Sequence, residues 1–250
     1  MNKLLHGDCL DLMMDIPHKS IDLILCDLPY GTTQCKWDVI IPFERLWLAY
    51  NRIIKDNGAI VLFGAEPFSS MLRLSNLEMY KYDWIWDKVK GTNFLNAKKQ
   101  PMRNHEIISV FYKNQCTYNA QKTSGHIHKK TFRAKHLQTE VYGEMTKDYH
   151  YSSTDRYPRS IQVFSTDTQN SSLHPTQKPV SLCEYLINTY TNEGELVLDN
   201  CAGSGTTAIA AINTNRNYLC IEKDETYYKK SIGRISSHNK NMSMVCVAEN

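Results

Sequence analysis

Short apolar runs alternate with segments of helical periodicity along most of this chain. The apolar runs predict strands at residues 3–6, 21–26, 59–63, 82–86, 107–112, 196–198 and 218–221. The periodic segments predict helices at 9–15, 42–55, 66–77, 180–189, 206–213 and 224–236. The run at 21–26 is almost continuously apolar, which is typical of a parallel sheet that is covered on both faces. This alternation predicts an α/β fold.

Residues 113–172 break this pattern, because basic, hydroxyl-bearing and amide residues dominate there and no period holds. The stretch is too long for an ordinary loop. We therefore expect one domain in two halves, a catalytic half at 1–112 and a cofactor-binding half at 173–238. An inserted recognition region would occupy 113–172, and the Asn57-Gly58 pair would form a turn before the strand at 59–63. A loose tail is expected at 239–250.

Composition narrows the class of protein only a little. The 250 residues suit one large domain with an insertion, and the net charge of +3 permits a nucleic-acid partner without requiring one. The eight cysteines form no C-x-x-C pair, so we expect free thiols and no metal site. No apolar stretch reaches a membrane-spanning length and no leader is evident, so we expect a cytoplasmic protein without a membrane partner.

The strand at 196–198 runs into the loop Asp199-Asn200-Cys201-Ala202-Gly203-Ser204-Gly205. Its small residues allow a ligand to approach the backbone. A P-loop would need a lysine after the last glycine, but Thr206 follows. The spacing of Gly203, Gly205 and Ala208 fits a dinucleotide fingerprint, although Asp199 would oppose a pyrophosphate. S-adenosylmethionine carries no phosphate, and Glu222 at the end of the next strand is placed to accept hydrogen bonds from ribose hydroxyls. A small-residue turn that binds no ligand is the remaining alternative interpretation.

A second junction follows the strand at 21–26, where the chain continues as Asp27-Leu28-Pro29-Tyr30. The exocyclic amino group of adenine or cytosine is a poor nucleophile because its lone pair is delocalised into the ring. Asp27 and the Leu28 carbonyl would localise that lone pair by accepting the two amino hydrogens. Pro29 would rigidify the turn, and Tyr30 would stack on the base. A simple turn with a packed tyrosine is the alternative interpretation.

Taken together, these segments resemble a known family. Residues 27–30 are similar to the D-P-P-Y motif of amino-group DNA methyltransferases, and residues 199–205 to their D-x-F-x-G-x-G cofactor loop. Residues 174–179 resemble the H-P-T-x-K-P segment. The order of these motifs resembles the β group. This resemblance implies a Rossmann-like, S-adenosylmethionine-dependent methyltransferase fold with a mixed seven-stranded sheet, circularly permuted, and an inserted target-recognition region.

The resemblance also implies roles for individual residues. Asp8 and Cys9 would contact the cofactor adenine, Glu222 the ribose, and the 174–178 segment the methionine moiety. The implied cofactor-binding residues are Asp8, Cys9, His174, Thr176, Lys178, Asp199, Cys201, Ala202, Gly203, Gly205 and Glu222. Residues 84–88 and 105–111 resemble the two strands that shape the target-base pocket. Leu28 departs from the family's first proline, and Cys201 from its usual aromatic residue.

Basic residues gather between Lys98 and Lys135, where Glu106 is the only acid. Phosphates attract such a segment, so we expect DNA contact rather than a merely solvated loop. The expected DNA-binding residues are Lys98, Lys99, Arg103, Lys129, Lys130 and Arg133.

These observations predict a site-specific methyltransferase that acts on N6 of adenine in double-stranded DNA, by base flipping and direct in-line attack. Family usage associates an aspartate at the first motif position mainly with adenine. The same chemistry on cytosine N4 or RNA is the nearest alternative. A non-catalytic DNA-binding relative and a nicotinamide oxidoreductase are the others. A homodimer and a cognate restriction enzyme are possible partners.

Overall fold

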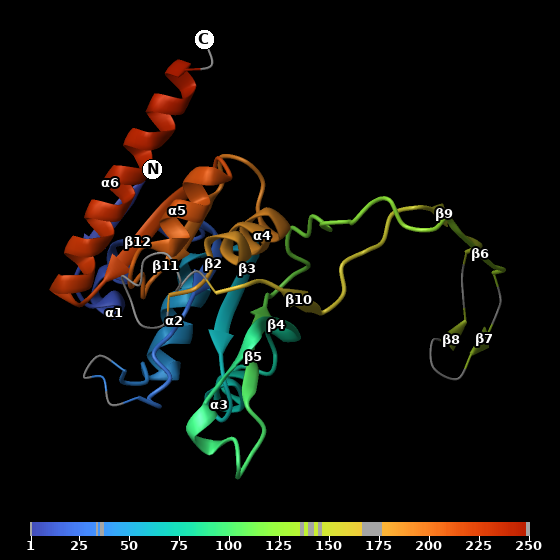
Figure 1. The fold of residues 1–250 in the computed structure, drawn as a ribbon, viewed down its shortest axis with the longest axis horizontal. Coiled ribbons are helices and arrows are strands. Elements are labelled where there is room, and N and C mark those ends of the chain that lie inside the picture. Colours follow the sequence, from blue (N-terminus) through green and yellow to red (C-terminus); the bar gives the residue numbers. More distant parts are fainter. Residues whose placement is uncertain are drawn as a thin grey trace. The chain divides into compact units, whose positions relative to one another are not determined.

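The computed structural model describes residues 2–33, 35, 38–135, 138–139, 143–144, 147–166 and 177–248. The chain forms two compact units, one made of Met1–Asn119 with Ser160–Asn250 and the other of Ala120–Arg159 (Figure 1). The larger unit holds both junctions. No helix among the described residues is long and apolar enough to cross a membrane.

The larger unit is built on one eight-stranded mixed sheet with the order β1-β12-β11-β2-β3-β5-β4-β10. The strands are β1 (Lys3–His6), β2 (Ile21–Cys26), β3 (Ile54–Gly64), β4 (Tyr80–Thr92), β5 (Arg103–Phe111), β10 (Ile161–Val163), β11 (Leu196–Asp199) and β12 (Asn217–Glu222). In the order of the sheet, the five strands β1, β12, β11, β2 and β3 are parallel. Strand β5 is antiparallel to both of its neighbours, β3 and β4. The predicted α/β architecture with a mixed sheet is confirmed, but among the described residues the sheet has eight strands rather than the predicted seven.

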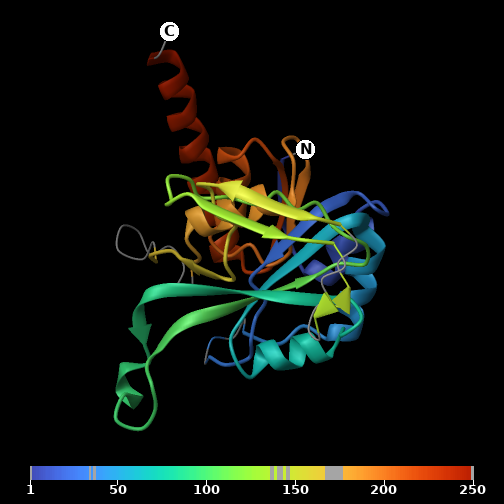
Figure 2. The ribbon, with the colours of Figure 1, turned by 90° about the vertical axis from the view of Figure 1, so that its right-hand side faces the viewer.

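Helices cover the sheet on both faces (Figure 2). The helices α4 (Val180–Tyr190) and α5 (Thr206–Asn213) pack on one face, together with Ile235 of α6 (Glu225–Ala248). The helices α1 (Cys9–Leu12), α2 (Phe43–Ile53) and α3 (Phe68–Leu74) pack on the other. Strand β2 contributes Leu23 to the first core and Ile24 to the second, and both are fully buried. Burial on both faces explains why this strand is an unbroken apolar run.

The permuted order makes β2 and β11 direct neighbours, with Leu23 opposite Val197 and Ile24 opposite Leu198. Both strands run in the same direction. Because the carboxyl ends of parallel strands meet at one edge of a sheet, Asp27 and Asp199 come to the same edge although they lie far apart in the sequence.

Three local predictions are wrong. Asn57-Gly58 lies inside β3 instead of forming a turn, within a register shift that faces residues 21–23 of β2. A Cβ on Gly58 would lie 2.8 Å from the Asp22 carbonyl oxygen, so close backbone approach explains this glycine. Residues 161–163, expected in the insertion, form the edge strand β10. Helix α6 continues to Ala248, where a loose tail was expected.

The smaller unit contains an antiparallel ribbon of β6 (Lys129–Arg133) and β9 (Tyr149–Ser153), and the short pair β7 (Gln138–Thr139) and β8 (Gly143–Glu144). This unit spans 120–159, which is shorter than the predicted insertion at 113–172. Residues at both margins of that range belong to the larger unit instead. Cys116 is buried in its core, and the Asn119 amide donates to the Thr189 carbonyl at 2.7 Å.

Candidate active site

The larger unit contains a cavity of about 750 Å³ at the carboxyl ends of β2, β11 and β12. Its lining includes Asp27 to Tyr30 on one side and Asp199 to Ser204 on the other, with Glu222 beyond. Its volume is in the range of pockets that hold ligands the size of cofactors and drugs. One cavity therefore serves both junctions that the sequence singled out.

Asp27 follows β2 and has both carboxylate oxygens engaged. Lys178 Nζ donates to Oδ2 at 2.6 Å, and the Tyr30 hydroxyl donates to Oδ1 at 2.6 Å. Burial raises the pKa of Asp27 above its usual value, and Glu106 raises this pKa further, while Lys178 opposes both effects. Each carboxylate oxygen keeps a second lone pair, so Asp27 retains acceptor capacity toward the cavity.

Lys178 lies at the centre of a buried chain of alternating charges. Its Nζ is 3.2 Å from Glu106 Oε2 on β5, and Glu106 Oε1 is 2.5 Å from Lys88 Nζ on β4. Asp27 and Glu106 raise the pKa of Lys178 against the opposing effect of its burial, so the ammonium stays charged. A buried ion pair loses its stabilisation when one partner is removed, because an uncompensated charge is left. This series of ion pairs therefore determines which charges surround Asp27.

The loop after Tyr30 is held by a carboxylate that sequence reasoning missed. Asp38 accepts hydrogen bonds from the backbone amides of Gly31, Thr32 and Thr33 at 2.7–2.9 Å. A hydrogen bond from the Thr33 side chain, together with these backbone bonds, lowers the pKa of Asp38 below its usual value, despite the opposing effect of burial. This loop borders the cavity, so Asp38 shapes the wall next to Tyr30.

Tyr30 and Leu28 are positioned by packing. The Tyr30 ring is stacked on Phe68 with centroids 4.9 Å apart, and Lys178 Nζ is 5.8 Å from the Tyr30 centroid. The Leu28 side chain is buried in the core beneath the sheet edge. An apolar side chain is thus accommodated where the family motif has its first proline.

Asp199 ends β11 and binds its own loop. Its Oδ1 accepts from the Cys201 amide at 3.0 Å, and its Oδ2 accepts from the Thr207 hydroxyl at 2.6 Å. Burial raises the pKa of Asp199 to about 6. The Asn200 side chain accepts a 2.6 Å hydrogen bond from Tyr50 of α2. Helices α5 and α2 therefore fix the turn through Thr207 and Tyr50.

Glu222, at the end of β12, lines the same cavity as the Asp199 loop. Its carboxylate accepts from the amides of Gly203 and Asp224, each at 2.7 Å, and burial raises its pKa. Gly205 has φ +78°, a conformation that favours glycine, and a Cβ there would lie 3.3 Å from Ser231 Cβ. The small residues of this turn, which we expected to let a ligand approach, are therefore also required by packing within the protein.

Asp8 and Cys9 border the same side of the cavity. Asp8 caps α1 through the Leu10 amide at 2.9 Å and pairs with Lys223 at 3.0 Å. The Cys9, Cys26 and Cys201 thiols form a hydrogen-bonded cluster, and burial raises the pKa of Cys26 to about 12. These thiols therefore stay protonated, and Cys9 and Cys201 add weakly polar side chains to the cavity lining.

The charge around Asp8, Asp199 and Glu222 discriminates between classes of ligand. Asp8, Asp199 and Glu222 bring three carboxylates to the lining, while Lys178 and Lys223 are paired with acids. Such a surface opposes a pyrophosphate and suits a ligand with an amino group and hydroxyls. The residues present therefore fit S-adenosylmethionine better than a dinucleotide. Within the described ranges, no group of three His, Cys, Asp or Glu side chains could hold a metal ion.

Other predicted site residues lie in several places. His174 and Thr176 fall outside the described residues. Lys178, predicted beside the methionine moiety, binds Asp27 and Glu106. Of the predicted DNA-binding residues, Lys98, Lys99 and Arg103 belong to the larger unit, and Lys129, Lys130 and Arg133 to the smaller one. Glu106 had a sequence signal as the only acid in a basic span, although its link to Asp27 was missed.

Comparison with protein families decides the class of this chain. The model of the DNA methylase family N6_N4_Mtase matches residues 21–233. The chain belongs to this family. The predicted β-group resemblance is therefore confirmed, and with it methyltransferase activity on DNA and the cofactor S-adenosylmethionine. The choice between adenine and cytosine is not decided by membership.

Curated relatives cover most of the chain. Type II methyltransferase M.HinfI of Haemophilus influenzae is 29% identical over 91% of this chain and 66% of its own length. Type II methyltransferase M1.MboII of Moraxella bovis is 27% identical over 92% and 95%, respectively. The DNA adenine methyltransferase YhdJ of Escherichia coli is 26% identical over 94% and 83%. The chain thus spans just under two thirds of M.HinfI and nearly all of M1.MboII.

Solved structures show the same fold. An M1.HpyAVI–SAM complex superposes with a TM-score of 0.65 at 22% identity, over 94% of this chain and 99% of that one. The cytosine-N4-specific PvuII DNA methyltransferase gives a TM-score of 0.65 at 17% identity, over 92% and 85%. At these identities the likeness establishes the fold and leaves the target base open.

Proposed function

We propose that this DNA methyltransferase transfers a methyl group to the exocyclic N6 of adenine in double-stranded DNA. The observation that carries the proposal is the Asp27 carboxylate, which Lys178 and Tyr30 hold at the cavity edge next to the Asp199 loop. A nearby cation favours an ionised carboxylate, and an ionised carboxylate accepts hydrogen bonds from an amino group without donating any.

The chain's own residues orient the amino nitrogen. Asp27 accepts one amino hydrogen and the Leu28 carbonyl accepts the other, so the lone pair is localised on the nitrogen instead of being delocalised into the ring. Tyr30 stacks on the flipped base with the face that Phe68 leaves free. When bound, S-adenosylmethionine would supply the methyl group: as the new nitrogen–carbon bond forms, the carbon–sulfur bond would break with its electrons left on sulfur, and the amino nitrogen would pass one proton to solvent water. Positioning and charge complementarity carry most of the rate.

The cofactor lies along the carboxylate-lined side of the cavity in this proposal. Glu222 receives the ribose hydroxyls, because its carboxylate lines the cavity and has more lone pairs than the backbone amides of Gly203 and Asp224 occupy. Asp199 and its loop, including Cys201, Ala202, Gly203 and Gly205, surround the methionine part. Asp8 and Cys9 border the adenine. Lys178 binds Asp27 and lines the cavity between the place of the base and the place of the cofactor.

Contacts to DNA come from two basic surfaces. One face of the β6–β9 ribbon carries Lys129 and Arg133, and these line a second cavity of about 490 Å³ with Tyr149, Tyr151, Arg156, Tyr157, Arg159 and Thr131. Because side chains alternate along a strand, Lys130 lies on the opposite ribbon face, as does Phe132. A two-stranded ribbon fits the major groove of B-DNA. Lys98, Lys99 and Arg103 supply phosphate contacts from the larger unit.

The test is mass spectrometry of nucleosides from unmethylated DNA after incubation with the protein and methyl-labelled S-adenosylmethionine. We expect labelled N6-methyladenine, and sequencing of the product then maps the target site. Labelled N4-methylcytosine would keep the enzyme and overturn the base assignment. If methyl label is found only when RNA is supplied in place of DNA, the substrate is RNA. If no nucleic acid is labelled although S-adenosylmethionine binds measurably, the protein is a DNA-binding relative without activity. A homodimer and a cognate restriction enzyme stay predictions.

A further inference from the structure

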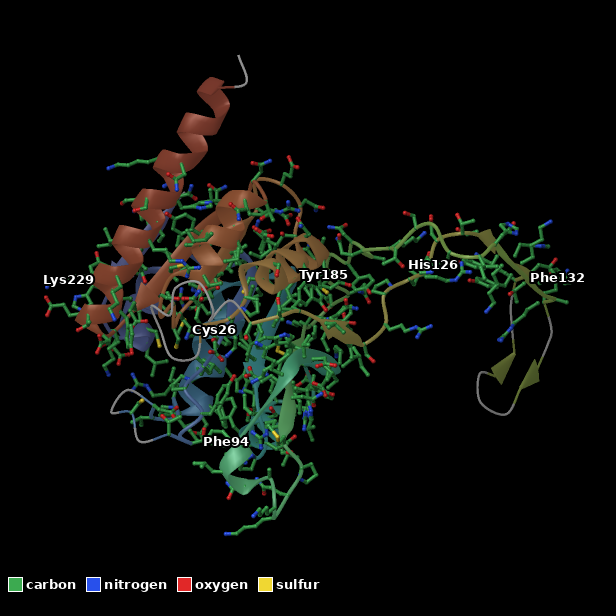
Figure 3. All side chains as sticks on the ribbon, viewed as in Figure 1. Cys26, Phe94, His126, Phe132, Tyr185 and Lys229 are labelled. Atoms are coloured by element: carbon green, nitrogen blue, oxygen red, sulfur yellow. The ribbon has the colours of Figure 1, made fainter. Side chains whose placement is uncertain are left out.

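The hairpin between β4 and β5 ends in a tip, residues 93–102, that exposes neighbouring apolar side chains. Phe94 is 73% exposed and Leu95 is 83% exposed. Figure 2 shows the β4–β5 hairpin extending beyond the helices that cover the sheet, and Figure 3 labels Phe94 at the end of this hairpin. Single exposed apolar residues need no explanation, but two large adjacent ones at the end of a projecting hairpin indicate a contact surface.

The tip is an ordered turn with its own hydrogen bonds. Phe94–Asn96 forms one turn of 3₁₀ helix, and the Asn96 side chain donates to the Asn93 side chain at 2.8 Å. The Lys99 amide donates to the Asn96 carbonyl at 2.8 Å. In the stem, Gly91 lies so close to Met102 that a Cβ would meet it at 3.0 Å. Phe94 and Leu95 are therefore presented by a fixed scaffold at little entropic cost.

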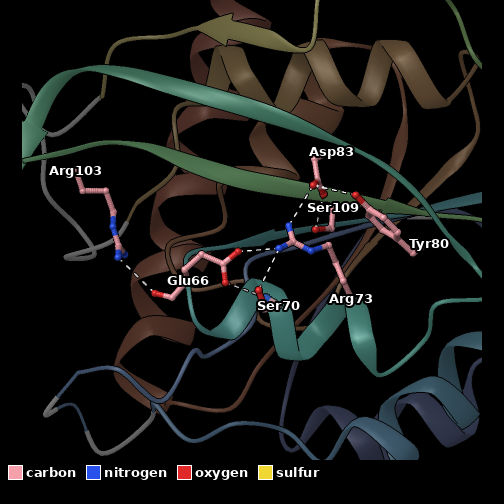
Figure 4. A network of polar contacts seen from close by, with 7 residues as sticks. All are labelled: Glu66, Ser70, Arg73, Tyr80, Asp83, Arg103 and Ser109. Atoms are coloured by element: carbon pink, nitrogen blue, oxygen red, sulfur yellow. Dashed lines mark hydrogen bonds and ion pairs between the residues drawn. The ribbon is translucent and has the colours of Figure 1, made fainter. Parts of the chain in front are cut away.

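The base of the hairpin is fastened to the body of the larger unit (Figure 4). Arg103 donates to the Glu66 carbonyl at 3.4 Å, and the Glu66 carboxylate is 2.7 Å from Arg73 of α3. Arg73 also binds Asp83 of β4 at 3.1 Å. The pairing of β4 with β5 is irregular between Asp87 and Thr92. Val89 in this stretch adopts φ +68°, and its backbone amide donates to the Asp87 side chain at 2.8 Å. Left-handed backbone at a β-branched residue is costly and persists only where its surroundings fix it.

The charge around the tip suits a polyanion. From residue 89 to residue 105 the sequence contains no acid, and Lys90, Lys98, Lys99 and Arg103 are all exposed. Phosphates attract such a cluster. The same charge repels a second copy of the tip, which disfavours a symmetric contact between two chains.

The base of the hairpin, rather than its tip, is close to the candidate base pocket. Glu106, which contacts Lys178 beside Asp27, follows Arg103 by three residues on β5. At about 3.3 Å per residue, this separation is roughly 10 Å. The hairpin therefore starts beside the candidate base pocket and carries Phe94 and Leu95 farther out on the same element.

We propose that Phe94 and Leu95 form an apolar wedge that enters the base stack of duplex DNA next to the target base, while the surrounding cations hold the phosphates. This inference rests on the proposed function. A base leaves the duplex at the expense of its stacking and pairing, and inserted apolar side chains replace part of the lost stacking. The wedge thus stabilises the extruded state and takes no part in the transfer.

The experiment compares the double variant Phe94→Ala/Leu95→Ala with the wild type and with Leu48→Ala. Leu48 is 74% exposed on α2, outside the hairpin, so its removal matches the loss of exposed apolar surface. Each protein methylates two duplexes that carry the site mapped as above. One is fully paired, and the other has an abasic position opposite the target base, which lowers the cost of extrusion. Calorimetric titration with S-adenosylmethionine and sedimentation accompany every protein.

On the paired duplex, we expect methylation by the double variant to be about 10-fold slower or worse, since extrusion loses its replacement stacking. On the abasic duplex its rate should lie within about threefold of the wild type. Leu48→Ala should match the wild type on both duplexes, and cofactor affinity should be unchanged throughout.

Two results for the double variant would overturn the wedge while leaving the proposed function intact. One is a wild-type rate on the paired duplex, and the other is an equal loss on both duplexes. An equal loss together with a dimer-to-monomer shift would assign the tip to a contact between copies. If the wild type methylates neither duplex, the proposed function fails first and the wedge fails with it.

Discussion

Two strand ends at one sheet edge carry carboxylates with opposite kinds of partners. Asp27 after β2 is bound by side chains, the Lys178 ammonium and the Tyr30 hydroxyl. Asp199 at the end of β11 is bound by the Cys201 amide and the Thr207 hydroxyl of its own loop and helix. The first carboxylate is tuned by charge from distant segments, whereas the second stabilises the local turn that follows it.

This difference indicates a division of labour. A carboxylate that closes its own turn shapes a binding surface, and its removal should mainly weaken the binding of the cofactor. A carboxylate that distant ions hold at a cavity edge is prepared for a reacting group, and its removal should mainly slow transfer. The following substitutions test that contrast, from the largest expected effect to the smallest.

Asp27→Asn should have the largest effect. The amide removes the negative charge and turns one acceptor into a donor, so the substrate amino group loses its partner. We expect methyl transfer to DNA to fall at least about 100-fold, as for other groups that act in the transition state. Transfer of a tritiated methyl group measures this rate. Wild-type turnover in a folded Asp27→Asn protein would remove Asp27 from the mechanism.

Lys178→Met should come next and should change the pH profile. Without the ammonium, Asp27 faces Glu106 with no cation between them, and its already raised pKa rises further. The acceptor must be ionised, so the acidic limb of the kcat profile should move to higher pH. The rate at neutral pH should fall about 10-fold or more.

Glu106→Gln is the matched control, because it removes the negative neighbour and keeps Lys178. It should leave the limb in place or move it to lower pH, since Glu106 raises the pKa of Asp27. Cys26, Tyr30, Cys183 and Asp199 also surround Asp27 and are unchanged in both variants. A uniform loss in Lys178→Met, with no change of profile, would limit Lys178 to a structural role.

Asp199→Asn should weaken S-adenosylmethionine binding about 10-fold at pH 8, where the wild-type carboxylate is ionised. The Asp199 pKa of about 6 sets the direction of the pH effect in the wild type. As pH falls through that value the carboxyl becomes protonated and attracts the cationic ligand less, so affinity should decline. Calorimetry from pH 5 to 8 checks both points. A pH dependence that persists in Asp199→Asn would assign it to another group.

Tyr30→Phe should have the smallest effect. The ring keeps its packing on Phe68, and only the hydrogen bond to Asp27 is lost. We expect about a fivefold fall in kcat with little change in KM for DNA. A loss as large as that of Asp27→Asn would show that the hydroxyl itself takes part in the reaction.

The sequence was most informative where local pattern and fold agree. Strand β2 was predicted at its observed bounds because burial on both faces leaves an unbroken apolar run. Helix α5 was predicted at Thr206–Asn213 because a small-residue turn precedes it. Once both strand ends were identified, a parallel sheet implied that Asp27 and Asp199 share an edge.

Sequence reasoning was weakest where the outcome depends on segments that are distant along the chain. Asn57-Gly58 has the composition of a turn, but pairing of β3 with β2 absorbs it as a bulge. No local pattern links Glu106 to Lys178, because their contact exists only after β5 and the segment before α4 come together. The same reason explains why Asp38 was missed, since its hydrogen bonds with the amides of Gly31, Thr32 and Thr33 form only in the folded protein.

The contrast between the two carboxylates is tested most directly by titrating S-adenosylmethionine into the Asp27→Asn protein, which should be inactive in transfer. The account predicts a dissociation constant within about threefold of the wild type, because Asp27 serves the base and not the cofactor. Binding weaker by more than about 10-fold in a folded variant would contradict the account, since it would make Asp27 a cofactor residue like Asp199.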